Sequence, residues 1–246
     1  MAGHSKWANI KHRKGRQDAK RGKLFAKLTK GIEAAARAGG GDPAANPTLA
    51  TAIQTAKDAS VPKDNIDRAI ARGTGESDGV AYEEAWYEGY APGGVALYVE
   101  ILTDNRNRAA ADVRSTFTKH GGRLGEPGSV GYLFEQRGYL LVSGDEETVM
   151  LAAIDGGADD IARSGDQWEI TSSPSDLAAI RESLEDVAIQ IDQAEVTQLP
   201  TTTIPVNEAT APKVLRLVDA LEDLDDVQAV YANFDISDDV LADIGS

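Results

Sequence analysis

The sequence contains no cysteine among its 246 residues, which excludes disulfide bonds, thiolate metal ligands and cysteine nucleophiles. Its three histidines, His4, His12 and His120, stand in no metal-ligand spacing. Aromatic residues make up only 6%, which argues against a long stacking platform for single-stranded bases. No apolar run approaches the roughly 18–20 residues that a membrane helix needs. We therefore expect a cytoplasmic protein that holds no metal or cofactor and does not span a membrane.

Signals for catalysis are also scarce. Ser129 lies in GSVG, which lacks the G-x-S-x-G form of a nucleophile elbow. The loop Gly121–Gly131 has no GK[ST] ending, so it is no P-loop. Acidic clusters at Asp155–Asp160 and Asp223–Asp226 fit solvation and helix capping better than Mg²⁺ binding. We expect no catalytic residues, no enzymatic activity and no small-molecule substrate.

Positive charge, by contrast, is concentrated at one end of the chain. Residues 1–37 hold eleven Lys and Arg against two acids, a local net charge of +9. The whole chain carries −15, so the remaining residues sum to −24. This division indicates that the N-terminal end contacts a polyanion, which the rest of the chain would repel. A mitochondrial address in residues 1–14 is an alternative interpretation, because that segment is basic and free of acids.

The first third of the sequence predicts a small domain of three helices. A basic arm, residues 1–15, precedes a helix over 19–38 that ends at Gly39-Gly40-Gly41. Further helices are expected over 47–59 and 62–72, followed by a linker at 73–79. The helix over 19–38 places Leu24, Phe25, Leu28, Ile32, Ala35 and Ala36 on one face.

Beyond the linker, the hydrophobic pattern changes to that of strands. Strands are expected over 81–90, 94–103 and 132–135, with a helix from a cap at Asp104 or Asn105 to Lys119. Residues 138–199 then predict the order β-α-β-β-α-β, which is that of a ferredoxin-like unit. Its expected elements are strands at 139–142, 160–164, 167–171 and 189–198, with helices at 146–155 and 175–187.

The last two elements decide the domain organisation. A helix over 207–221 and a strand over 227–235 have no partner unless they return to the sheet that begins at Ala81. The sequence therefore predicts an α+β fold with an N-terminal three-helix domain and two α/β domains, of which the ferredoxin-like one is inserted in the other. The expected boundaries are 1–78 for the basic helical domain, 79–136 with 201–246 for the middle domain, and 137–200 for the insertion.

The basic residues of the first domain are the main candidates for nucleic-acid binding. Lysines three and four residues apart form a stripe on one face of the helix, opposite its apolar face, and such a stripe can follow a phosphate backbone. A solvated helix face is the alternative, but such faces usually interleave acids with the bases. Trp7 is expected either to stack on a base or to belong to the domain core. The candidate residues are Lys6, Lys11, His12, Arg13, Lys14, Arg16, Lys20, Lys23, Lys27 and Lys30.

A second candidate contact lies at Asn105-Arg106-Asn107-Arg108, where a strand leads into a helix and free N–H groups favour anions. Arg106 and Arg108 would bind phosphate there, and Arg114, Lys119 and Arg123 are further candidates. The alternative is that Asp104 caps the helix while the arginines pair with the acidic body. For the loop 121–131, tight turns are the favoured role of the glycines, and close approach of a ligand is the alternative.

Several of these segments carry a resemblance to a known family. The opening MAGHSKWANIKHRKGRQDAKRGKLFAKL is very similar to the start of the YebC family, which includes mitochondrial translational activators of cytochrome oxidase. The segments PKDNIDRAIARGTGE, YEGYAPGGVA and TDNRNRAAADVRSTFTKHGGRLGEPGSVGYLF resemble it as well, so the likeness extends nearly end to end. Ala91 and Ala109 depart from the family, which more often has Gly and Thr there, without loss of a charged group.

The resemblance implies a non-enzymatic regulator of gene expression, because members are described as DNA-binding transcriptional regulators or as ribosome-associated translation factors. The basic helix offers mostly Lys, which suits phosphates better than base edges. We therefore favour ribosomal RNA or the ribosome as partner, with duplex DNA as the alternative. Ribosomal or other proteins are expected to contact the acidic body.

Overall fold

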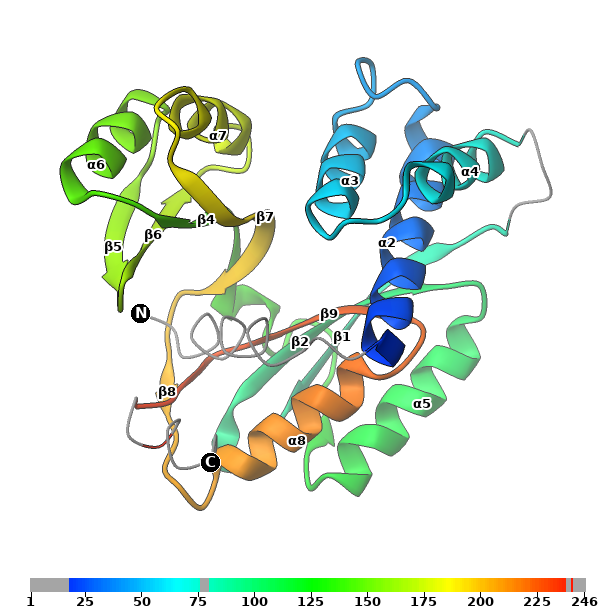
Figure 1. The fold of residues 1–246 in the computed structure, drawn as a ribbon. Coiled ribbons are helices and arrows are strands. Elements are labelled where there is room, and N and C mark those ends of the chain that lie inside the picture. Colours follow the sequence, from blue (N-terminus) through cyan, green and yellow to red (C-terminus); the bar gives the residue numbers. More distant parts are fainter. Residues whose placement is uncertain (1–17, 76–79, 238–239, 241–246) are drawn as a thin grey trace. The chain divides into compact units, whose positions relative to one another are not determined.

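The computed structural model describes residues 18–75, 80–237 and 240, with side chains from residue 21 onward, and confirms the predicted α+β class (Figure 1). It divides into two compact units. One comprises residues 135–199, and the other comprises the described parts of 1–134 and 200–246. We describe each unit separately.

Three helices form the first part of the larger unit. The apolar face of the first helix packs against the other two, with Ile32 and Leu49 fully buried between them. Asn46 joins the first two helices, because its side chain accepts a bond from Leu49 N and donates bonds to the carbonyls of Ala35 and Gly40. Leu24, expected on the apolar face, is 43% exposed. The helices are α2 (Asp18–Gly39), α3 (Pro47–Asp58) and α4 (Lys63–Gly73).

A four-stranded sheet of order β3-β1-β2-β9 follows in the same unit. The helices α5 and α8 lie side by side along one face of it (Figure 1), and Phe117 and Leu217 are fully buried in the core between. The pairs β1–β2, β1–β3 and β2–β9 are antiparallel, so the C-terminal strand returns to this sheet as predicted. The elements are β1 (Glu83–Tyr90), η1 (Pro92–Gly94), β2 (Ala96–Thr103), α5 (Arg106–Lys119), β3 (Arg123–Leu124), η2 (Gly131–Leu133), α8 (Ala211–Glu222) and β9 (Val227–Ala232).

The strand expected over 227–235 is interrupted at Asn233. The Asn233 side chain accepts a bond of 2.7 Å from Ala96 N and donates one of 3.2 Å to Thr202 O. Asn233 N still donates to Ala96 O over 3.2 Å, but the Asn233 side chain, not its backbone carbonyl, accepts the bond from Ala96 N. The strand β9 therefore ends at Ala232, and the chain continues in β10 (Phe234–Asp235). This short strand pairs in parallel with β8 (Ile204–Pro205).

The smaller unit has the predicted order β-α-β-β-α-β, and its sheet order is β5-β6-β4-β7. Leu140, Ile170 and Ile180 are fully buried in its core. Separate strands near 132–135 and 139–142 were expected, but the first strand of this unit runs unbroken from Phe134. The strand β4 passes close to β6 at Gly138, because a Cβ there would lie 2.4 Å from Ser172 Oγ. The elements are β4 (Phe134–Ser143), α6 (Glu146–Asp155), β5 (Asp160–Ser164), β6 (Gln167–Ser172), α7 (Leu177–Asp186) and β7 (Gln190–Pro200).

Candidate nucleic-acid interface

The predicted contact residues fall into two groups. Those of the N-terminal arm lie outside the described residues: Lys6, Lys11, His12, Arg13, Lys14 and Arg16, and so does Trp7. Lys20 lies in the first turn of α2, but its side chain is outside the description. The structure places the remaining candidates, which are Lys23, Lys27, Lys30, Arg106 and Arg108.

The three lysines of α2 whose side chains are described share one face of the helix, as their spacing predicts, and all three contact the end of α8 or the turn that follows it. Lys23 Nζ donates to Asp223 O over 3.1 Å, and Lys27 Nζ donates to Glu222 O. Lys30 Nζ donates to Asp226 Oδ1 over 2.8 Å. Figure 1 shows the N-terminal half of α2 beside the C-terminal end of α8. We call Lys23, Lys27 and Lys30 the lysine face, and residues 222–226 the acidic turn.

The chemistry of this contact follows from the end of a helix. The last carbonyls of α8 lack intrahelical partners and carry partial negative charge, which favours cations. Lys23 and Lys27 satisfy two of them, at Asp223 and Glu222. The lysine face is therefore neither a bare solvated surface nor an open phosphate track in this structure, because each described lysine has an intramolecular acceptor.

Asp226 lies at the centre of the polar contacts. Besides Lys30, its carboxylate accepts bonds from Arg108 Nη2 over 2.8 Å and from Thr103 Oγ1 over 3.0 Å. Its pKa is shifted by two opposing effects: burial raises it, but the hydrogen bonds from Lys30, Arg108 and Thr103 leave it below its ordinary value. Asp226 thus joins α2, the end of β2 and the start of α5.

In the Asn-Arg-Asn-Arg turn, neighbouring residues have different roles. Asn105, one of the two expected caps, closes the N-terminus of α5 by accepting a bond from Arg108 N. Arg108 pairs with Asp104 over 2.6 Å as well as with Asp226, and these bonds raise the pKa of its guanidinium. The Arg106 side chain is exposed and makes no hydrogen bond or ion pair with the residues that the structure describes.

The further candidates on α5 are distant from this turn. Lys119 is the last residue of the helix, about 20 Å from its start at a rise of 1.5 Å per residue. Arg123 lies beyond that end, with its guanidinium 4.9 Å from the centre of the Tyr90 ring. The structure therefore brings Arg108 to the lysine face, but it does not bring Lys119 or Arg123 there.

A second buried acid, Glu33, holds α2 in place. Its carboxylate accepts bonds from Arg72 Nε of α4 over 2.8 Å and from Val80 N over 3.1 Å, and the residue is 3% exposed. The sequence gives no sign of this role beyond an acid on the apolar side of a basic helix. Because Glu33 and Lys30 are one turn apart, the two contacts fix the same part of α2.

The glycine-rich loop, residues 121–131, binds a carboxylate of the same chain. The Glu88 carboxylate accepts bonds from the backbone N–H groups of Gly128, Val130 and Gly131 over 2.7, 2.6 and 2.8 Å. Burial raises the pKa of Glu88, but these bonds lower it below its ordinary value. The amides that would cradle a phosphate are occupied, which supports the turn interpretation of this loop over ligand binding.

Aromatic rings gather on the face of the sheet that α5 and α8 leave uncovered. Trp86 stacks on Tyr98 with ring centres 4.3 Å apart, and Tyr231 lies 6.1 Å from Trp86. Glutamates accompany the rings: Glu84 accepts a bond from Trp86 Nε1, and Glu100 accepts one from Tyr231. These carboxylates would repel a phosphate backbone, so the stack is a poor base platform despite its rings.

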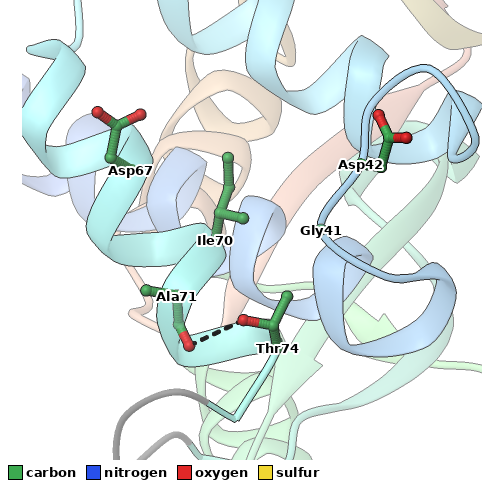
Figure 2. A pocket seen from close by; sticks show the side chains of 6 residues that line it. All are labelled: Gly41, Asp42, Asp67, Ile70, Ala71 and Thr74. Carbon is green, nitrogen blue, oxygen red and sulfur yellow. Dashed lines mark hydrogen bonds between the residues drawn. The ribbon is translucent and has the colours of Figure 1, made fainter.

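The hollow beside α4 does not suit an anionic ligand. A shallow hollow of about 520 Å³ lies between α4 and the loop after α2 (Figure 2), and its two charged lining residues, Asp42 and Asp67, are acids. Within the described ranges, no three His, Asp or Glu side chains lie together so as to hold a metal ion. No described helix is long and apolar enough to cross a membrane.

Comparisons with known proteins cover nearly the whole chain. Residues 5–76 match the family model described as the TACO1/YebC protein N-terminal domain, and residues 82–234 match the model described as the TACO1/YebC second and third domain. A protein of Rubrobacter xylanophilus is 56% identical over 99% of both chains, and one of Acidothermus cellulolyticus is 55% identical over 99% of this chain and 100% of the other. Both are named "Probable transcriptional regulatory protein".

A solved structure is similar as well. The crystal structure of a conserved hypothetical protein from Aquifex aeolicus superimposes with a TM-score of 0.81 at 48% sequence identity. The match covers 90% of this chain and 93% of the other. The similarity therefore includes most of both chains.

Proposed function

The chain belongs to the TACO1/YebC family, and on that premise we propose that it is a non-enzymatic regulator of gene expression that binds nucleic acid through its N-terminal domain. The partner we propose is ribosomal RNA in the ribosome, bound in support of translation. The observation that carries the proposal is the separation of charge, +9 in residues 1–37 against −24 in the rest. In a protein with this charge distribution, a polyanion attracts the basic end and repels the acidic remainder of the chain.

The arm is the part of this domain best suited to the first contact. Residues 1–17 contain five Lys and Arg and no acid, whereas the lysine face of α2 is engaged with the acidic turn. Phosphate contacts of this kind supply affinity without reading sequence. We therefore assign the arm to initial binding, with the exposed Arg106 as a second contact.

RNA is favoured over DNA by the kind of cation on α2. A helix that reads the major groove presents Arg, Asn or Gln to base edges, because their paired donors and acceptors match the bases. The lysine face carries point charges only, which suit the phosphates of a folded RNA. The acidic smaller unit, with fifteen Asp and Glu against three Arg in residues 135–199, fits contact with basic proteins such as those of the ribosome.

A DNA-binding transcriptional regulator is the second candidate, because the relatives named above are called probable transcriptional regulatory proteins. It would use the same basic domain. Both candidates predict a steep dependence of binding on salt, so salt alone does not separate them.

Co-sedimentation with ribosomes at near-physiological salt, with excess duplex DNA present, tests the two candidates. Deleting residues 1–37 is unsuitable, because it removes Ile32 and Ala36 from the helical core. The sharper variant is the arm triple Lys11→Gln, Arg13→Gln and Lys14→Gln. Its matched control removes three exposed lysines elsewhere, by Lys57→Gln, Lys63→Gln and Lys213→Gln.

Retention on ribosomes that the arm triple loses and the control triple keeps is the expected result. Displacement from the ribosome by duplex DNA would favour the transcriptional candidate instead. A protein that neither pellets with ribosomes nor binds duplex DNA in a direct titration would overturn the proposal.

A further inference from the structure

We propose that the acidic turn is an intramolecular competitor for the lysine face, so that a bound polyanion replaces residues 222–226 on α2 and frees this helix surface. This inference rests on the proposed function, because it concerns how the same basic domain engages its ligand. In the unbound state the lysine face stays bound to residues 222–226, until phosphate groups displace these internal acceptors.

The first support is that the internal acceptors are of the kind that a phosphate offers. Lys23 and Lys27 bind oxygen atoms with partial negative charge at the end of α8, and Lys30 binds a carboxylate oxygen. Although an ammonium group has three N–H donors, Lys27 and Lys30 are only partly exposed, so a phosphate has little access to them while the acidic turn is in place. Binding of a polyanion along the whole lysine face therefore requires that the acidic turn be displaced.

The second support is a gradient of exposure along the face. The Lys23 side chain is 51% exposed and its distance to Asp223 Oδ1 is 3.7 Å, which makes the pair loose. The Lys30 side chain is 14% exposed and lies 2.8 Å from Asp226. Displacement is thus easiest at the N-terminal end of the face and most costly at Lys30, because exposed pairs contribute little and buried ones resist separation.

The third support is the order of the chain. The basic arm leads directly into α2, and Lys23 is the nearest lysine whose side chain is described. A polyanion held by residues 1–17 is therefore at high effective concentration beside the loose end of the face. The polyanion therefore binds the arm first and then displaces the acidic turn.

A reversible cross-link between α2 and the acidic turn tests the proposal. The chain has no cysteine, so Lys23→Cys with Asp223→Cys introduces a single pair and leaves the net charge unchanged. A bismaleimide with a central disulfide joins the two thiols and is cleaved again by a reductant. Affinity for ribosomes and for duplex DNA is measured on the same protein before and after cleavage, across a range of salt concentrations.

We expect the cross-linked protein to bind at least about fivefold more weakly than the cleaved one. Its plot of log affinity against log salt should also be shallower by up to about 0.9 per lysine that stays engaged on duplex DNA. Equal affinity and equal slope before and after cleavage would overturn the proposal and leave the lysines as permanent caps of α8. If neither the wild type nor the cleaved protein binds either polyanion, the proposed function itself has failed.

A charge-matched pair of variants gives a second measurement. Asp223→Asn weakens the hold on Lys23, whereas Asp225→Asn removes the same charge from an exposed residue that makes no ion pair within the described part of the chain. We expect Asp223→Asn to bind polyanion about two- to fivefold more tightly than Asp225→Asn, from the usual strength of an exposed ion pair. Equal affinities of the two variants would count against the proposal.

Discussion

Lys30 of α2 and Asp226 of the acidic turn form an ion pair of 2.8 Å in which both side chains are nearly buried, at 14% and 11% exposure. The two residues stand 196 positions apart in the chain. Arg108 and Thr103 bind the other carboxylate oxygen, so the charge of Asp226 is balanced and its oxygens are satisfied. This network links the helical part of the larger unit to its sheet.

Removing the Asp226 carboxylate should destabilise the protein strongly. In Asp226→Ala, Lys30 keeps its charge in a nearly buried position without its partner, and we expect a loss of about 3 kcal/mol in the free energy of unfolding. Urea denaturation measures it. Asp225→Ala, in the same turn but exposed, is the control and should change stability by less than about 0.5 kcal/mol. Equal losses in both variants would contradict a central role of Asp226.

The Asp226 carboxylate also makes the free energy of unfolding depend on pH. The folded pKa of Asp226 lies below its ordinary value, so its contribution is complete above about pH 4 and is lost as the pH falls through the lowered folded pKa.

Glu100 should show the opposite dependence on pH. Burial raises the pKa of Glu100, and the hydrogen bond from Tyr231 offsets only part of that rise. Above its folded pKa the charged carboxylate therefore destabilises the fold, and we expect Glu100→Gln to raise the free energy of unfolding at pH 7. The gain should shrink as the pH falls and vanish below about pH 4, where the wild-type carboxyl is neutral in both states.

Urea denaturation of Glu100→Gln and wild type at pH 7 and pH 3.5 measures this difference. Glu83→Gln removes an exposed carboxylate of the same sheet and serves as the control. A gain for Glu100→Gln that is the same at both pH values would show that burial of charge is not its cause.

Much of the fold was predictable because its signals are local. The helix expected over 146–155 has those bounds in α6, since an Asp cap, an apolar stretch and a following glycine lie within a dozen residues. The return of the chain to the first sheet followed from counting strands that lacked partners. The break at Asn233 was missed, because it depends on bonds to Ala96 and Thr202, which are far away in sequence.

The candidate site was predictable only in part, for the same reason. The spacing of Lys23, Lys27 and Lys30 fixes a common face, but nothing local indicates that this face meets residues 222–226. The sequence shows a basic helix and a distant acidic cluster, and each alone is typical of a solvated surface. Whether the lysine face and the Arg106 turn bind nucleic acid stays a prediction.

Two glycines allow a matched test of how α2 packs. A Cβ at Gly73 would lie 2.5 Å from Glu33 O, so α4 approaches α2 there without room for a side chain. We expect Gly73→Ala to lower the free energy of unfolding by about 1–3 kcal/mol. Gly31→Ala, where no atom lies within 4 Å, should instead raise it by about 0.5–1 kcal/mol through helix propensity. Thermal or urea denaturation of both variants decides whether close packing of the two helices is required.

The two arginines of the Asn-Arg-Asn-Arg turn should separate binding from stability. Arg106 is exposed and unengaged by the described residues, so Arg106→Gln should leave the midpoint of unfolding unchanged while it lowers the salt slope of duplex binding by about 0.9. Arg108 is bound to Asp104 and Asp226, so Arg108→Gln should lower the midpoint, because Asp226 then loses one of its partners. Measuring denaturation and binding for both variants assigns the turn. An unchanged salt slope in Arg106→Gln would show that Arg106 does not contact nucleic acid. The turn would then serve only to stabilise the fold, through the ion pairs of Arg108 with Asp104 and Asp226.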